Sequence, residues 1–254
     1  MKVTAPVHLL VATLLAAAAM GGEEPAGAPF HFEYDIAPRL ARAGCAAADC
    51  HGGATGRGGF KLSLFATNAR ADYEAITQDL DGRRVDYRDP EDSLVLRKPT
   101  RQMKHKGGKV IAQGGATHRA LADWIAAGAP FARGDRGVLE EVGLTLDAKQ
   151  ARVTATFKQS DGKRRERDVT GLARFQSTDE RVVAVDADGR LTPGEAGEAW
   201  IIARYASRSA RVPVLRPYGT GETTTPAGES SLDTVWGARL AQLGLKPAAR
   251  APDH

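Results

Sequence analysis

Residues 44–51 read GCAAADCH and contain both cysteines of the 254-residue chain. Covalent attachment of haem needs two thiols that form thioethers with the vinyl groups, and an imidazole directly after the second thiol that reaches the iron. Cys45, Cys50 and His51 meet this need, although four residues instead of the usual two separate the cysteines. The segment therefore predicts one haem c, with Cys45 and Cys50 as attachment points, His51 as proximal iron ligand, and an outward-bulging loop between the thiols.

The residues alone leave two other fates open for the cysteines. A disulfide between Cys45 and Cys50 suits an exported chain, but it gives the adjacent His51 no role. A structural zinc site prefers four protein ligands, and the sequence has no second cysteine pair.

An electron carrier generally needs a sixth iron ligand, and Met103-Lys104-His105 offers two donors on one loop. Residues i and i+2 of an extended segment point the same way, so His105 or Met103 can reach the iron. Methionine raises the reduction potential and histidine lowers it. His118 is expected to be solvated at the start of a helix, and His31 lies too close to a linker for this role.

A basic run surrounds these candidate ligands. It has six basic residues and no acidic one: Arg97, Lys98, Arg101, Lys104, Lys106 and Lys109. It is either a rim that steers an acidic redox partner or offsets the haem propionates, or a solvated loop. A net charge of +4 is mild and no nucleic-acid-binding module is recognisable, so no nucleic-acid partner is expected.

The chain begins with a pattern typical of a secretory signal peptide over residues 1–22. Lys2 is followed by an apolar run, Val7 to Met20, and then by small residues. The run is too short for a comfortable membrane span, although a retained N-terminal anchor is the alternative. We expect a periplasmic, secreted or cell-envelope protein that does not span the membrane after signal removal, with a linker over residues 23–29.

The pattern of the remaining chain changes twice. Residues 30–133 favour a small domain with a helix after Asp35, an extended run from Phe60 to Leu64, a helix near Asp72 and a clear helix from Thr117 to Ala127. Residues 139–217 alternate in strands and turns, which predicts a β-sandwich of about seven strands. Residues 218–254 predict a flexible linker and one amphipathic helix, whose apolar face consists of Leu232, Val235, Trp236, Leu240 and Leu243.

Several stretches in order resemble a known family. FEYDIAPRLARAGCAAADCHGG, GGFKLSLFATNARADYEAI, HKGG and LADWIAAGAPF resemble the planctomycete-type cytochrome c domain, and residues 153–205 are similar to the bacterial Ig-like group 2 (BIG2) domain. Together these domains form the N-terminal part of large exported proteins with uncharacterised C-terminal domains. The resemblance implies a mixed fold class of two domains, a small mostly α class I cytochrome c-like domain followed by an all-β immunoglobulin-like sandwich.

The resemblance also implies site residues and an extent. The family's histidine before a double glycine matches His105, which makes it the favoured distal ligand over Met103. The tail LDTVWGARLAQLGLKP resembles only the opening of a further domain. We therefore expect a truncated or split gene product whose C-terminal helix docks on a separate protein or domain.

The expected function is an exported c-type haem protein that transfers electrons to a redox partner. An enzyme is not expected, because a hexacoordinate haem leaves no open position and no constellation of nucleophile and base is present. The alternative is a haem-free cell-envelope adhesion or carbohydrate-binding protein that uses the Ig-like domain.

Overall fold

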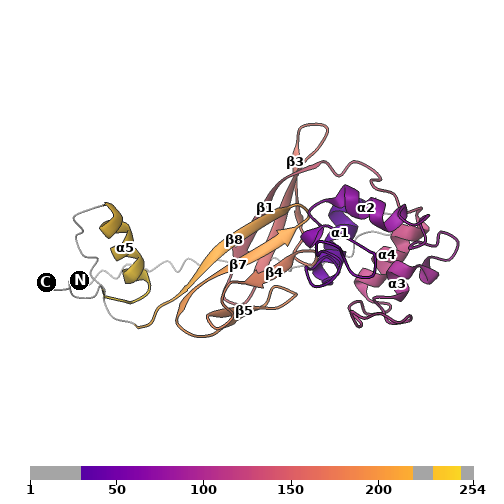
Figure 1. Cartoon of the computed structure of the whole chain (residues 1–254). Helices are drawn as coiled ribbons and strands as arrows, with labels where there is room; N and C mark the ends of the chain where they lie inside the picture. The colour runs from indigo at the N-terminus through magenta and orange to yellow at the C-terminus, as the bar shows by residue number, and fades with distance from the viewer. Residues whose placement is uncertain (1–29, 220–230, 247–254) are drawn as a thin grey trace, which may run out of the picture.

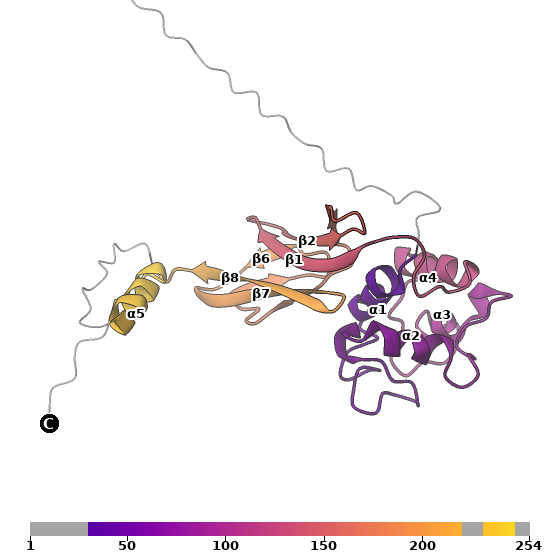
Figure 2. The same ribbon diagram turned by 90° about the horizontal axis from the view of Figure 1, so that it is seen from above.

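The computed structural model describes residues 30–219 and 231–246. The predicted signal peptide, the linker over residues 23–29 and most of the linker predicted from residue 218 lie outside these ranges. The helices of residues 30–133 gather at one end, antiparallel strands occupy the middle, and a last helix lies at the other end (Figures 1 and 2).

The N-terminal part, residues 30–133, consists of short helices joined by long loops. Its elements are η1 (Phe32–Ile36), α1 (Ala37–Arg42), η2 (Leu64–Ala66), α2 (Ala69–Thr77), η3 (Pro90–Asp92), α3 (Leu94–Arg97) and α4 (Ala116–Ala126). Leu121, Trp124 and Ile125 of α4 are almost completely buried, as their spacing predicts. They pack in one apolar cluster with Phe32 and Ile36, so α4 packs against η1, the segment that leads into α1.

The predicted helices lie where the sequence places them, but their first residues differ from the predicted ones. Helix α4 starts one residue before the predicted Thr117, and its N-cap is Gly115 without a side-chain bond. The first helical segment starts at Phe32, and Asp35 lies inside η1, where its carboxylate accepts from the His31 backbone N–H at 2.9 Å. The segment predicted to be extended from Phe60 to Leu64 forms no named strand: Phe60 makes a single bridge to Arg57, Ser63 has extended backbone, and Leu64 begins the 3-10 turn η2.

The C-terminal part contains eight strands within the described residues: β1 (Val138–Leu146), β2 (Ala151–Lys158), β3 (Arg164–Asp168), β4 (Arg174–Ser177), β5 (Val183–Val185), β6 (Leu191–Pro193), β7 (Gly197–Tyr205) and β8 (Arg208–Arg216). They form three antiparallel sheets, ordered β1-β2-β3, β4-β7-β8 and β5-β6. Alternate residues of β2 and β7 are buried, and Val153, Phe157 and Ile201 share one core.

The expected fold class is wrong. Helix and strand contribute about equally, 26% and 27%, and the strands lie in small antiparallel sheets, which does not show a mostly α class I cytochrome c-like domain followed by an all-β immunoglobulin-like sandwich. The α-helices of residues 30–133 have only 6, 9, 4 and 11 residues. Two of these helices end at glycines, because Gly44 directly after the C-cap of α1 and Gly128 directly after the C-cap of α4 have positive φ. Residues 30–219 and 231–246 also contain no group of three or more His, Cys, Asp or Glu side chains that could hold a metal ion.

The helical and β parts share a buried polar contact region. The carboxylate of Asp35 lies 2.7 Å from the Arg167 guanidinium of β3 and 3.4 Å from that of Arg136. Tyr34, next to Asp35, belongs to the core of the β part and packs edge-on against Phe157, with ring centroids 5.0 Å apart. The segment that leads into α1 is therefore held by both parts.

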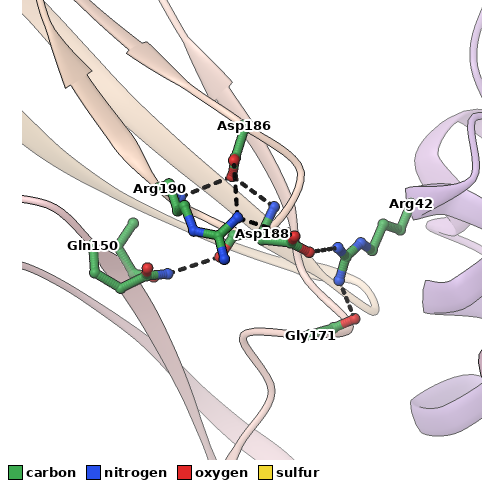
Figure 3. A network of polar contacts seen from close by, with 7 residues as sticks. Arg42, Gln150, Gly171, Asp186, Asp188 and Arg190 are labelled. Atoms are coloured by element: carbon green, nitrogen blue, oxygen red, sulfur yellow. Dashed lines mark hydrogen bonds and ion pairs between the residues drawn. The ribbon is translucent and has the colours of Figure 1, made fainter.

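A second contact starts at the C-terminal end of α1. Figure 3 shows Arg42 reaching to the turn between β5 and β6, where it lies 2.5 Å from Asp188 and also donates to the Gly171 carbonyl. The turn itself is ordered by Asp186, whose carboxylate accepts from the backbone N–H groups of Asp188 and Arg190 at 2.8 Å each. Arg42 lies only three residues before Cys45, so this network anchors one end of the cysteine loop.

The predicted C-terminal helix is confirmed as α5 (Ser231–Gln242). Leu232, Val235 and Trp236 are between 64% and 75% exposed, whereas Arg239 pairs with Glu198 of β7. None of the described helices combines the length and the apolar character that a membrane crossing requires.

Candidate functional site

The predicted site residues converge on one cavity of about 790 Å³ in the N-terminal part. Cys45, Cys50, His51 and His105 all line it, although His105 lies more than fifty residues along the chain from the others. Met103 is not among the lining residues, and its side chain is partly exposed. The structure thus brings together both cysteines and two histidines, and leaves the alternative ligand Met103 outside.

The loop between the cysteines is closed by backbone hydrogen bonds. The His51 N–H donates to the Cys45 carbonyl at 3.0 Å, so the two ends of the wide gap lie side by side. Ala48 and Asp49 are exposed, as an outward bulge predicts, but Ala46 is completely buried. The loop therefore bulges only at its far end. Both cysteines are free thiols, so the alternative disulfide is not formed, and burial raises the pKa of Cys45 to about 12.

Gly52 explains how the chain leaves this loop. A Cβ at this position would lie 2.1 Å from the Ala46 carbonyl oxygen, closer than any side chain tolerates. The close approach lets Gly52 N–H donate to Ala47 O at 2.9 Å, and His51 then turns into the cavity. A glycine directly after His51 is therefore a requirement of the loop.

The imidazole of His51 is fixed by a backbone acceptor. Its Nδ1 donates to the Phe60 carbonyl at 2.9 Å, and its ring contacts the Phe60 ring at a centroid distance of 4.6 Å. A carbonyl can only accept, so Nδ1 carries the proton of the neutral ring and Nε2 keeps its lone pair. Burial lowers the pKa of His51, which favours this neutral form.

His105 is held in the same way on the opposite loop. Its Nδ1 donates to the Gly108 carbonyl at 2.9 Å. A Cβ on Gly107 would lie 2.8 Å from the His105 ring, and Gly108 has a φ of +77°. The double glycine therefore lets the backbone fold back under the imidazole and leaves the Nε2 lone pair of His105 available.

The imidazole rings of the two histidines lie close to each other among the residues that line the cavity. Their ring centroids are 6.3 Å apart and their planes differ by 19°. An iron atom held between two imidazole nitrogens at bond lengths of about 2 Å places the ring centres roughly 6 Å apart. The described residues place no third His, Cys, Asp or Glu with this pair in an arrangement that could hold a metal ion, whereas a porphyrin supplies four nitrogens of its own. The residues present therefore fit a haem.

The walls and rim of the cavity also suit this group. The walls are largely apolar: Leu40, Phe60, Leu62, Leu80, Leu94, Val95, Pro99 and Val110. Six basic residues and no carboxylate occur among the described lining residues: Arg57, Arg83, Lys98, Lys104 and Lys106, which are at least partly exposed and form a polar rim, and the buried Arg84. An apolar slot with cations at its edge matches an apolar macrocycle that carries two propionates.

Sequence reasoning placed some residues wrongly and missed others. His118 is only 4% exposed, contrary to the expected solvated position, and its Nε2 lies 3.2 Å from the Glu91 carboxylate. His31 stacks on Tyr34 at 4.3 Å, far along the chain from the ligand pair. Phe60 and Arg84 were missed, because neither the carbonyl of Phe60 nor the burial of Arg84 leaves a pattern in the local sequence.

Comparisons with known proteins add little. No family model and no curated protein matches the chain. Among solved structures, "Structure of surface layer protein SbsC, domains 1-6" shares 23% sequence identity at a TM-score of 0.25, over 33% of this chain and 15% of that chain. The likeness is too weak to carry an argument about fold or function.

Proposed function

We propose that this chain is an exported electron-transfer protein that holds one covalently attached haem c. Cys45 and Cys50 are the attachment points, His51 is the proximal ligand and His105 is the distal ligand. The observation that carries the proposal is the pair of imidazoles, 6.3 Å apart in one cavity with both cysteines, each with Nδ1 bound to a carbonyl.

The residues of the chain have separable roles in this proposal. When bound, the haem iron takes up and releases one electron. The Phe60 carbonyl fixes the orientation of the His51 ring, and the Gly108 carbonyl fixes that of the His105 ring. The hydrogen bond at Nδ1 also makes the Nε2 of each ring a stronger electron-pair donor to iron. Two histidine ligands favour a lower potential than a histidine and methionine pair. The apolar walls limit the access of water, which keeps the cost of reorganisation on electron transfer small.

The basic rim supports two further parts of the proposal. Arg57, Lys98 and Lys104 line the cavity and are at least partly exposed, so they can offset the charge of the propionates. The cations left over attract an acidic surface of a redox partner. We place this exchange in the periplasm, outside the cell or at the cell envelope, on the basis of the signal pattern in residues 1–22.

Pyridine haemochrome analysis of the full chain, exported together with the haem-attachment machinery, tests the proposal. The expected spectrum is that of a haem bound through two thioethers, with a low-spin Soret band in the native protein. The variant that combines Cys45→Ala with Cys50→Ala should lose covalent haem. Met103→Leu serves as the matched control and should keep it.

A colourless wild-type protein would overturn the proposal. If that protein, and also the double cysteine variant, bound cell envelope or carbohydrate, the adhesion alternative would take its place.

A further inference from the structure

Arg84 is a buried guanidinium beside the candidate site. It lies on the loop between α2 and η3, lines the cavity, and is only 7% exposed. Its Nη1 donates to the Ala75 carbonyl at 2.7 Å, and its Nη2 donates to the Gly59 carbonyl at 3.3 Å. Burial of an arginine this deeply reduces the free energy of unfolding. Its position beside the candidate site therefore points to a role for the charge in that site.

The contacts of Arg84 lead directly to His51. Its guanidinium carbon lies 4.5 Å from the centroid of the Phe60 ring, a cation–π contact, and its Nη2 bonds the preceding residue, Gly59. Phe60 supplies the carbonyl that accepts from His51 Nδ1. Arg84 therefore contacts both the Gly59 carbonyl and the Phe60 ring. These two groups belong to consecutive residues, and the Phe60 carbonyl that accepts from His51 follows directly.

The charge of Arg84 is only weakly compensated. Its nearest carboxylate among the described residues is Asp79, at 4.0 Å, and the Asp79 side chain is 61% exposed to water. No carboxylate occurs among the described residues that line the cavity. A buried positive charge therefore faces the cavity in surroundings of low dielectric, where it is poorly screened.

We propose that Arg84 is a positioning residue for His51 and a fixed positive charge that raises the reduction potential of the haem. The inference rests on the proposed function. The oxidised iron carries one more positive charge than the reduced iron, so a nearby fixed cation disfavours the oxidised state. This contribution opposes the lowering effect of two histidine ligands.

The midpoint potential of the holoprotein tests the charge. Arg84→Gln should lower the equilibrium constant of reduction at least tenfold. For a one-electron couple this corresponds to a midpoint potential lower by about 59 mV. Arg88→Gln is the matched control, since Arg88 lies on the same loop, is exposed, does not line the cavity, and loses the same formal charge. It should change the constant by less than about threefold, because water and salt screen its charge. Equal shifts in the two variants would overturn the proposal.

Arg84→Lys tests positioning, and it remains decisive if the glutamine variant fails to fold. Lysine keeps the charge, but one ammonium cannot stack on Phe60 and reach both Gly59 and Ala75. The potential should stay within about threefold of wild type, whereas the His51 Nδ1 proton, followed by NMR, should exchange faster with solvent. Unchanged exchange would refute the positioning role, and a potential as low as in Arg84→Gln would refute the role of the charge.

Haem content is measured first on every sample. A wild-type protein without haem would refute the proposed function, whereas wild type and variants that bind haem with equal potentials would refute only the role of Arg84.

Discussion

The hydroxyl of Tyr205, at the end of β7, donates a hydrogen bond of 2.9 Å to the backbone carbonyl of Tyr34 in η1. Both tyrosines are at most 6% exposed, and burial raises the pKa of Tyr205 above its ordinary value. The bond joins residues 171 positions apart. The β part therefore helps to hold the segment that leads through α1 to Cys45.

Tyr205→Phe should destabilise the whole described fold rather than the β part alone. It leaves a buried carbonyl without this donor, which costs about 1–3 kcal/mol. Urea unfolding of wild type and variant measures the loss, with the fluorescence of Trp124 in α4 and Trp200 in β7 as reporters. Tyr218→Phe, at a side chain that is 60% exposed, is the control. Equal midpoints for the two variants would show that the bond contributes nothing.

The distal ligand is predicted to be His105. His105→Ala should change the haem spectrum from low spin to high spin and allow carbon monoxide to bind, because an axial position opens. Met103→Leu should leave both readouts as in wild type, since Met103 does not line the cavity. The reverse pattern, with loss of the low-spin spectrum only in Met103→Leu, would identify methionine as the ligand.

The reactivity of Cys45 should depend strongly on pH in protein made without haem. Burial raises the pKa of this thiol from 9.0 to about 12, and only the thiolate attacks alkylating reagents. At pH 8 the folded chain should react with iodoacetamide at Cys45 at least about a hundredfold more slowly than the unfolded chain. The rate should still rise with pH between 8 and 10. Mass spectrometry of the peptides gives both rates, and equal rates in folded and unfolded protein would contradict the burial of the thiol.

Gly52→Ala should disrupt the cysteine loop, because its Cβ would lie 2.1 Å from the Ala46 carbonyl oxygen. A loss of stability of about 2–4 kcal/mol is expected, since the backbone must move. Gly143→Ala in β1 is the control, because its nearest contact would be an ordinary 3.8 Å. Thermal unfolding of the two variants makes the comparison. A similar melting temperature in both variants would mean that the loop does not need the close approach of Gly52 to the Ala46 carbonyl oxygen.

The sequence predicts the local chemistry of the site, but not its surroundings. The spacing of Cys45, Cys50 and His51, and the double glycine after His105, are local patterns that point to the lining of one cavity. Arg84 and the Phe60 carbonyl have no such pattern, because their roles depend on contacts between separate loops. A helix was expected after Asp35, but nothing in the sequence predicts the pairing of Asp35 with Arg167, which joins residues 132 positions apart. The expected mostly helical domain fails for a different reason, since its helices are short and long loops, some with glycines of positive φ, join them.

The mass of the mature protein, purified from its own host, tests the central claim most directly. One haem joined through two thioethers adds the full mass of the group, and proteolysis should recover that mass on the peptide that contains Cys45 and Cys50. A mass equal to that of the bare polypeptide, with both thiols free or joined in a disulfide, would contradict the account.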